Sequence, residues 1–457
     1  MSPAFKSPLD LAHELQKALF RASTDGELLG SGIALQAAIH PLTRELGFSM
    51  PGAAPAVAQA NLTILQNLDS KVVQFVFPVQ GALPLPAGAL AGPAGNFDFI
   101  RQRQFGNLLG ELGNWIVSAA LNIPQRLEGD TLAAAAHGIE AASKNEGFID
   151  LAQGYTAPAS PSRLAGASGK RVLLFVHGIF SSIQGAFQAL GPADQPSVLQ
   201  TLLQRYQGNV FGYDHWTISK TPLENALDLL DAIPAGANWT IDLVCHSRGG
   251  LVCRSLLADP SAAASLANPD LLALPGKRQG KIAGLNRALF VAAANQGSPL
   301  ANPDDIRNFL NVAALLASTS GCFALDSVIG LARLAVSSAF DLPSIQQLAT
   351  TSSLVRDLNA SPSLLSVANA YAARADFDHA QSPLLEAGVL IDKLLMPVDN
   401  DLVVPYLGAA QPDPLIASDK LLNFGTPTAK QGSVWHTEFF SQAAVHDQLL
   451  AIFPPLP

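Results

Sequence analysis

The pattern of apolar and polar residues changes at about residue 170. Beyond this point, helix-like stretches separate short, predominantly apolar runs; the first is residues 171–176, and similar runs are residues 209–213, 240–245 and 288–294. Continuous apolar runs are typical of parallel strands that helices cover on both faces. We therefore expect an α/β domain with a mostly parallel sheet flanked by helices over residues 171–457.

Two further patterns complete this domain. Thr221, Pro222 and Glu224 form a capping box with proline at the first helical position, so a helix should begin there and end near Pro234. Residues 304–373 form a long, mostly helical interval with very few charged residues between 308 and 340. We expect this interval to be a helical cap or lid insertion, and helices that simply pack on the core are an equal alternative.

The first third of the chain has a different character. Residues 1–155 alternate helix-like runs with breaks rich in proline and glycine, and residues 71–79 carry the one strong strand signal. No set of catalytic side chains stands out in this part. The sequence predicts a mainly helical N-terminal accessory region over 1–155, followed by a linker over 156–170.

Composition narrows the class of protein. The 457 residues include 49% hydrophobic residues and carry a formal net charge of −9, without any cluster of lysine and arginine, which argues against binding to nucleic acid. Cys245, Cys253 and Cys322 are too few and too scattered for a disulfide framework or a zinc site. The first residues lack a basic start followed by a continuous apolar run, so we expect a cytoplasmic location.

Ser247 is the candidate nucleophile. It lies between a predicted strand, residues 240–245, and a predicted helix that begins at Arg248, and Gly249 follows two residues later. A nucleophile elbow requires this strand-turn-helix context, with small residues two positions before and after the serine. Cys245 stands where the usual G-x-S-x-G pattern has its first glycine, which is a departure from that pattern.

The chain order Ser, acid, His of α/β-hydrolases limits the choice of base and acid. His436 and His446 are the candidate bases; His446 lies on the apolar stripe of a predicted helix, so His436, which precedes that helix, is preferred. Asp399 and Asp401 are the candidate acids, although aspartate is also common in turns. Asp401 is preferred because it lies directly before the apolar run 402–404.

An oxyanion hole would complete such a site. We expect one donor in the backbone N–H of Arg248, at the start of a helix, where free N–H groups favour negative charge. The second donor should be the N–H of Ile179, in the loop after the strand 171–176, where Gly178 allows close approach to a substrate. His177 would then orient this loop.

Five segments in the correct order resemble the lipase/esterase branch of the α/β-hydrolases, which includes bacterial lipases and lecithin-cholesterol acyltransferase-like proteins. They are VHGIF, CHSRGG, AANQGSPLA, DLVVP and WHTEFF, and the resemblance covers residues 171–453. It implies an α/β-hydrolase fold and hydrolysis of small-molecule or lipid esters through an acyl-serine. It also implies that no metal or organic cofactor is required. The uncharged cap favours apolar acyl chains and transient contact with a membrane surface.

Three alternatives stay open at this point. An acyltransferase would use the same triad, and so would an amidase or peptidase. A protein from a different class, an inactive hydrolase-fold interaction protein, is also compatible with the altered elbow. The sequence does not specify the oligomeric state.

Overall fold

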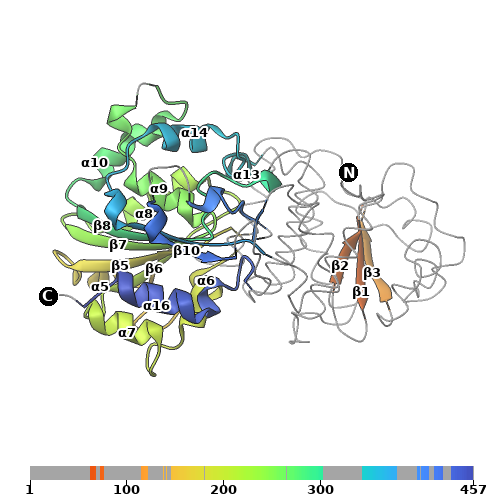
Figure 1. Ribbon diagram of the computed structural model, residues 1–457, viewed down its shortest axis with the longest axis horizontal. Coiled ribbons are helices and arrows are strands. Elements are labelled where there is room, and N and C mark those ends of the chain that lie inside the picture. The colour runs from red at the N-terminus through yellow and green to blue at the C-terminus, as the bar shows by residue number, and fades with distance from the viewer. Residues whose placement is uncertain are drawn as a thin grey trace, which may run out of the picture.

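Seven strands pair into one sheet in the order β10-β9-β8-β7-β5-β6-β4 (Figure 1). Their bounds are β4 Gly147–Asp150, β5 Arg171–Val176, β6 Val210–Asp214, β7 Trp239–His246, β8 Ile282–Val291, β9 Ala370–Ala375 and β10 Leu421–Phe424. Strands β5 to β10 are parallel, and only β4 pairs antiparallel, with β6. The predicted mostly parallel sheet is therefore confirmed, and with its flanking helices it forms an α/β-hydrolase fold.

This computed structural model describes residues 62–67, 73–76, 115–121, 137, 140, 146–179, 181–263, 265–301, 342–377, 399–401, 403–410, 416–425 and 434–455. The α-helices within them are α5 Pro161–Ala165, α6 Ile183–Phe187, α7 Val198–Arg205, α8 Pro222–Ala232, α9 Gly249–Leu257, α10 Leu274–Arg278, α13 Pro343–Gln346, α14 Ser353–Ala360 and α16 Ala443–Ile452. Short 3-10 helices lie at Gln188–Leu190, Pro260–Ala262, Pro269–Ala273, Pro299–Ala301, Val367–Asn369, Gly408–Ala410, Ser418–Lys420 and Phe439–Ser441.

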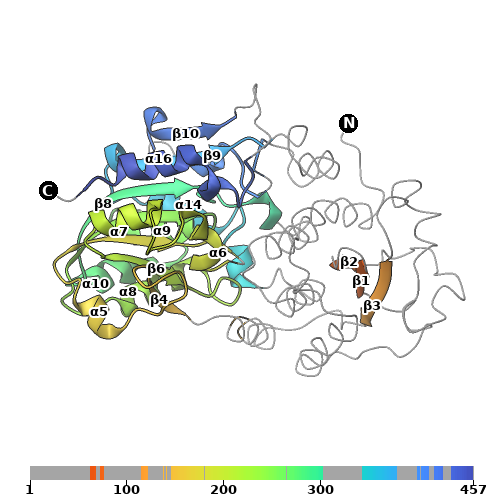
Figure 2. The ribbon, with the colours of Figure 1, turned by 90° about the horizontal axis from the view of Figure 1, so that it is seen from below.

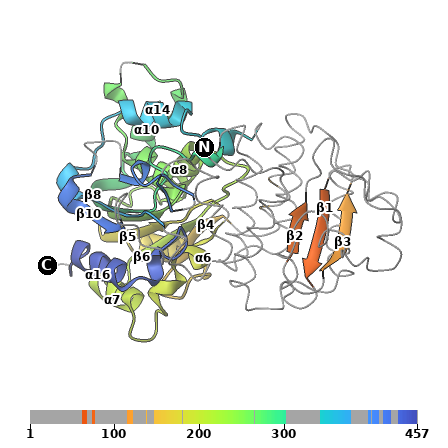
Figure 3. The ribbon, with the colours of Figure 1, turned by 45° about the vertical axis from the view of Figure 1, so that its right-hand side comes forward.

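Helices cover both faces of the sheet. Helices α8 and α9 lie on one face, and α7 and α16 lie on the other (Figures 1 and 3). Figure 2 shows α16 running along the part of the sheet that contains β8, β9 and β10. This two-sided cover explains why the strand sequences are predominantly apolar rather than alternating between apolar and polar residues.

Strand β5 illustrates the packing. Leu173 and Phe175 join the core cluster formed with α6, α7 and α16, whereas Val172, Leu174 and Val176 alternate with them and are equally buried. Successive side chains of a strand point to opposite faces, so each face of the sheet receives its own apolar layer. The central position of β5 and β7 in the sheet makes both strands rigid supports for the loops that follow them.

Helix α8 begins as the capping box predicts. The Thr221 hydroxyl accepts a hydrogen bond from the N–H of Glu224, and the Glu224 carboxylate accepts one from the N–H of Thr221. The helix ends at Ala232, two residues before Pro234. The signals at both ends of this helix were therefore sufficient to locate it.

Before residue 146, the described residues include a three-stranded antiparallel sheet in the order β2-β1-β3. Its strands are β1 Leu62–Asn67, β2 Val73–Val76 and β3 Trp115–Leu121. Strand β2 coincides with the predicted strand. Strand β3 corrects an expected helix, because its first residues, Trp-Ile-Val, have high strand propensity. The other predicted helices of the first 130 residues lie outside the described residues.

Two expected boundaries differ from the structure. Strand β4 lies in the stretch assigned to the accessory region, yet it pairs with β6 in the large sheet. Residues 156–170, expected as a linker, pack beside it: Arg163 forms an ion pair with Asp150 at 2.9 Å, and the N–H of Ala159 donates to the carbonyl of Phe148. The large sheet therefore begins before residue 171.

The expected cap, residues 304–373, is only partly within the described residues. Positions 304–341 lie outside them. Helices α13 and α14 lie in the remainder, but residues 370–373 already belong to β9, so the interval ends earlier than expected. Among the helices of the described residues, none combines the length and the apolar character needed to cross a membrane.

Candidate active site

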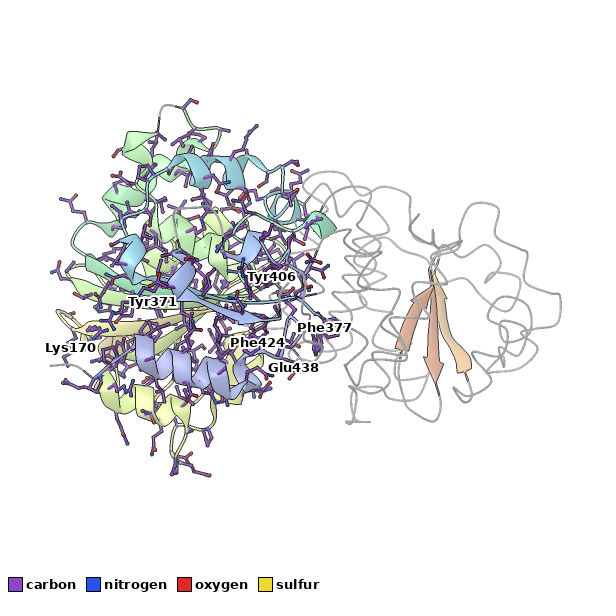
Figure 4. All side chains as sticks on the ribbon, in the orientation of Figure 1. Lys170, Tyr371, Phe377, Tyr406, Phe424 and Glu438 are labelled. Carbon is purple, nitrogen blue, oxygen red and sulfur yellow. The ribbon has the colours of Figure 1, made fainter. Side chains whose placement is uncertain are left out.

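The order of the strands defines one switch point at the carboxyl ends of the sheet. From β5 the chain passes to β6 on one side, and it then crosses to β7 on the other side of β5. In open parallel sheets, ligands bind at such a switch point, outside the carboxyl ends of the two strands. Figure 4 shows Lys170, which precedes β5, at one end of the sheet, and Phe377 and Glu438 at the opposite end.

Ser247 lies directly after β7, at the carboxyl end of that strand and therefore at the switch point. Its φ angle is 56°, in the left-handed region of backbone conformation that residues other than glycine rarely adopt. The N–H of Ser247 donates to the carbonyl of Val291, and its carbonyl accepts from the N–H groups of Gly250 and Ala294. These hydrogen bonds hold the strained turn between β7 and α9.

Two glycines let neighbouring backbone approach this turn. A Cβ on Gly249 would lie 2.5 Å from the carbonyl oxygen of His177 and 2.6 Å from that of Val176. A Cβ on Gly178 would lie 2.5 Å from the Cβ of Ser247. Both positions therefore require glycine, and the loop after β5 lies in contact with the serine.

A continuous chain of hydrogen bonds connects Ser247, His436 and Asp401. The Ser247 Oγ lies 2.8 Å from the Nε2 of His436, and the Nδ1 of His436 lies 3.0 Å from the Oδ2 of Asp401. Because the ionised carboxylate only accepts, Nδ1 carries the proton and Nε2 is free to accept the serine proton. All three side chains are buried.

Asp401 is held by its own loop. Its Oδ1 accepts hydrogen bonds from the N–H groups of Val403 and Val404, at 3.0 and 2.8 Å, and its main-chain carbonyl accepts from the N–H of His436. The hydroxyl of Ser298, in the loop after β8, donates to the carbonyl of Val403. The acid is thus oriented from two sides, and its Oδ2 points to the imidazole.

The alternative residues lie elsewhere. His446 is on α16, where its Nε2 hydrogen-bonds with the carbonyl of Phe440 at 2.6 Å. The main-chain carbonyl of Asp399 accepts from the N–H of Tyr406. Of the two candidate acids and two candidate bases, the hydrogen-bonded chain from Ser247 contains Asp401 and His436.

His246 is a buried residue of the site that the sequence reasoning did not single out. Its Nε2 lies 2.8 Å from the main-chain carbonyl of His436, and the two rings are 4.8 Å apart. Since a carbonyl only accepts, Nε2 carries the proton. Burial, and secondarily the nearby His436, lower the pKa of His246 from 6.5 to about 3, so the ring is neutral at ordinary pH. Its position next to Ser247 in the chain was the available signal.

The two expected oxyanion donors follow β5 and β7, at the carboxyl ends of these strands. Ile179 follows Gly178 in the loop after β5, and Arg248 is the N-cap of α9. Within the part of the chain that the structure describes, neither backbone N–H donates to a protein acceptor. Each N–H is therefore available to a substrate oxygen, one from each side of the switch point.

The side chain of Arg248 is held by α8 and by the residues that precede this helix. It is completely buried, and its Nη1 donates to the Oδ1 of Asn225 while its Nη2 donates to the carbonyl of Lys220. Burial lowers the pKa of Arg248 to about 10, and the negative charges of Glu140 and Glu224 oppose this shift. The guanidinium stays charged at neutral pH.

His177 orients the loop after β5. Its Nε2 accepts from the N–H of His215, and its Nδ1 then carries the proton and donates to the carbonyl of Gly178 at 2.8 Å. The rings of His177 and His215 stack at 4.0 Å. His177 therefore contacts its own loop and the segment after β6.

The departure at Cys245 does not prevent the turn. The Cys245 side chain is completely buried, with its Sγ 3.7 Å from the carbonyl of Leu289, and Ser247 still adopts its positive φ angle. Burial raises the pKa of the Cys245 thiol well above its usual range. Among the described residues, no group of three or more histidine, cysteine, aspartate or glutamate side chains is arranged to hold a metal ion.

Comparisons with known proteins found one matching family and several similar solved structures. The family described as "Domain of unknown function (DUF7379)" matches residues 141–454. No curated protein matches the sequence. One similar solved structure is lipase 1 from Pelosinus fermentans, with 16% sequence identity and a TM-score of 0.38; the match covers 63% of this chain and 100% of that chain. A second is the mature Bacillus licheniformis lipase BlEst2, with 15% identity and a TM-score of 0.33; the match covers 62% of this chain and 93% of that chain. A third is the phospholipase PlaB from Legionella pneumophila, with 16% identity and a TM-score of 0.31; the match covers 52% of this chain and 45% of that chain.

Proposed function

The chain belongs to the family described as "Domain of unknown function (DUF7379)", whose description names no activity, and from the site we propose that it is a serine hydrolase that cleaves carboxylic esters. The observation that carries this proposal is the hydrogen-bonded chain from Ser247 through His436 to Asp401, at 2.8 and 3.0 Å. Three groups that are distant in the sequence have no structural need to meet in this order. Their chemistry is that of an activated nucleophile.

In the proposed first step, the Oγ of Ser247 attacks the ester carbonyl carbon while the Nε2 of His436 removes the hydroxyl proton. The carbonyl oxygen becomes an oxyanion, which accepts hydrogen bonds from the N–H groups of Ile179 and Arg248. The imidazolium then gives its proton to the alkoxide oxygen as the C–O bond breaks. An alcohol leaves, and the acyl group stays on Ser247.

In the second step, water takes the place of the alcohol. His436 removes a proton from the water, the hydroxide oxygen attacks the acyl carbon, and the same two N–H groups hold the oxyanion. The bond to Ser247 Oγ then breaks, His436 returns the proton to the serine, and the carboxylic acid leaves. Asp401 stays ionised throughout and stabilises the imidazolium.

For the substrate, we propose esters with apolar acyl chains, either small molecules or lipids. The support lies in the sequence, where only Asp326 and Arg333 are charged between residues 308 and 340. The sequence predicts that this segment forms a cap, and an apolar cap favours an apolar acyl group. This proposal concerns the substrate class and is independent of the chemistry of the triad.

The test is hydrolysis of p-nitrophenyl esters with acyl chains from two to sixteen carbons. We expect turnover by the unchanged protein, with kcat/KM higher for medium or long chains than for acetate, and no turnover above background by Ser247→Ala. A strict preference for acetate would contradict the proposed acyl group. Hydrolysis that survives in Ser247→Ala, or that is absent from the unchanged protein, would contradict the proposed reaction.

A further inference from the structure

A segment that precedes the large sheet places a buried carboxylate against the loop after β6. Glu140 is completely buried. Its Oε1 accepts hydrogen bonds from the N–H groups of Thr217 and Ile218 and from the Thr217 hydroxyl, and its Oε2 accepts from the N–H of Ser219 at 2.8 Å and from the Ser219 hydroxyl at 2.6 Å. Five donors from three consecutive residues thus converge on one side chain.

The same segment contacts this loop at a second point. The ring of His137 meets the ring of Trp216 edge to face, with centroids 4.3 Å apart. A carboxylate that accepts hydrogen bonds from three consecutive N–H groups fixes the backbone of that stretch, because charge-assisted hydrogen bonds are strong and directional. Residues 216–219 are therefore shaped by a part of the chain that lies outside the strands and helices of the hydrolase fold.

This loop reaches both expected oxyanion donors. At its start, His215 stacks on His177 and donates its N–H to the Nε2 of that residue, and His177 holds the carbonyl of Gly178 next to Ile179. At its end, the carbonyl of Lys220 accepts from the guanidinium of Arg248. One side of the loop therefore supports the N–H of Ile179, and the other supports the N–H of Arg248.

We propose that Glu140 is a positioning residue for the oxyanion hole: by fixing residues 217–219, it sets the distance between the backbone N–H groups of Ile179 and Arg248. This inference rests on the proposed function. In this proposal, Glu140 acts through His177 and Arg248 and takes no part in the reaction itself. Its role is thus specific to the transition state, where the carbonyl oxygen carries negative charge.

The test compares Glu140→Gln with the unchanged protein, using a p-nitrophenyl ester that the unchanged protein hydrolyses. The glutamine has nearly the same size, but its amide nitrogen cannot accept, so two donors of the loop lose their acceptor. A displaced oxyanion donor lowers kcat by about 10- to 100-fold. We expect this loss in kcat with KM changed less than about threefold, because ground-state binding does not use the oxyanion.

A second readout separates positioning from general loosening. A trifluoromethyl ketone with an apolar chain forms a hemiketal with the nucleophilic serine, and its oxyanion occupies the same hole. Its inhibition constant should rise in Glu140→Gln by the same factor by which kcat falls. Both measurements are made well below the melting temperature of the variant.

Asp357 provides the matched control. It is a buried carboxylate on α14 that likewise accepts from a loop, through the N–H groups of Ala267 and Asn268 and the side-chain amide of Asn268. Asp357→Asn should lower the melting temperature comparably and leave kcat and the inhibition constant unchanged. If Glu140→Gln does not fold, Ser219→Ala removes a single hydroxyl donor and should lower kcat in the same direction by a smaller factor.

The outcomes are distinguishable. Equal kcat values for Glu140→Gln and Asp357→Asn, or an unchanged kcat in Ser219→Ala when Glu140→Gln does not fold, would overturn the role of Glu140 and leave the proposed function standing. Absence of hydrolysis by the unchanged protein, in the same assay, would overturn both.

Discussion

The residues of the proposed triad are oriented by hydrogen bonds from neighbouring groups. The Nε2 of His436 faces the Ser247 hydroxyl because Asp401 holds the opposite nitrogen, and Asp401 is itself held by the N–H groups of Val403 and Val404. His246 adds a hydrogen bond to the main-chain carbonyl of His436. The proposed roles of these residues depend on the directions of their hydrogen bonds, and single substitutions can test each role.

The choice of base is tested by comparing two histidines. His436→Ala removes the only base within reach of Ser247 in the described part of the chain, so kcat should fall by at least about four orders of magnitude. His446→Ala, on α16, should keep the activity of the unchanged protein in the same ester assay. A large loss in His446→Ala, together with full activity in His436→Ala, would contradict the assignment.

Backbone strain at Ser247 predicts that a glycine at this position gives a more stable protein than an alanine. Ser247→Ala and Ser247→Gly both lose the hydroxyl, but only alanine must keep a side chain at a φ angle of 56°. The glycine variant should therefore have the higher free energy of unfolding, by about 1 kcal/mol, as measured by urea denaturation. If the alanine variant is equally or more stable, the turn is not strained in solution.

His246 predicts how stability depends on pH. Its pKa is about 3 in the folded protein and 6.5 as the ordinary value, so between these values the unfolded chain binds more protons than the folded one. The stabilising contribution of the neutral ring is complete above pH 6.5 and is lost as the pH falls toward 3, by up to about 1.4 kcal/mol per pH unit. Urea denaturation across this range should show a shallower slope for His246→Gln, and identical slopes would contradict this.

Sequence reasoning reached the residues whose signals are local. Ser247 stands between a strand and a helix, and chain order narrowed the search for its partners to two aspartates and two histidines. Of these, Asp401 and His436 form one hydrogen-bonded chain with it. Glu140 and His246 escaped this reasoning. The partners of Glu140 lie 77 to 79 positions away in the chain, in a segment for which no motif was recognised. His246 hydrogen-bonds with the main-chain carbonyl of His436, 190 positions away, and its one local signal was its position next to Ser247.

At the scale of elements, the site depends on one strand-turn-helix unit at the centre of the sheet. Strand β7 lies between β5 and β8, so both its neighbours fix the point at which the turn begins. The close approach of the turn to the end of β5 is possible only because Gly249 lacks a side chain. The elbow is therefore a property of two strands and a helix rather than of the serine alone.

Gly249→Ala tests this packing. The new Cβ would lie 2.5 Å from the carbonyl oxygen of His177, and backbone cannot move aside as a flexible side chain can. The free energy of unfolding should fall by about 1 to 3 kcal/mol. Gly276→Ala in α10 is the control, because no atom lies within 4 Å of the new Cβ, and it should change stability by less than about 1 kcal/mol. Equal effects of the two substitutions on urea denaturation would argue against the tight turn.

The predicted elements show which signals are strong. Strands β5, β6 and β7 coincide with apolar runs, and α8 with its capping box, whereas the run 288–294 overlaps only the last part of β8, Ile282–Val291. Strand β9 was missed because its sequence AYAARA is mostly alanine, which has low strand propensity. Strand β4 was missed because it has only four residues and pairs at the edge of the sheet.

At the scale of the whole molecule, the sheet brings together loops from the entire second part of the chain. The loops after β5, β7 and β9 and the segment after β10 contribute Ile179, Ser247, Asp401 and His436 at the same edge. The order of these segments was predictable because all parallel strands end at one edge. Where the domain begins was not predictable, because β4 and Glu140 join it through contacts with residues far along the chain, such as the pairing of β4 with β6 and the hydrogen bonds of Glu140 to the loop after β6.

The central claim is that Ser247 is chemically activated by His436. The most direct measurement is the intact mass of the protein after treatment with a fluorophosphonate, followed by peptide mapping of the modified residue. The account predicts a single adduct on Ser247 in the unchanged protein and none in His436→Ala under the same conditions. An unlabelled protein, or an adduct on another residue with Ser247 unmodified, would contradict it.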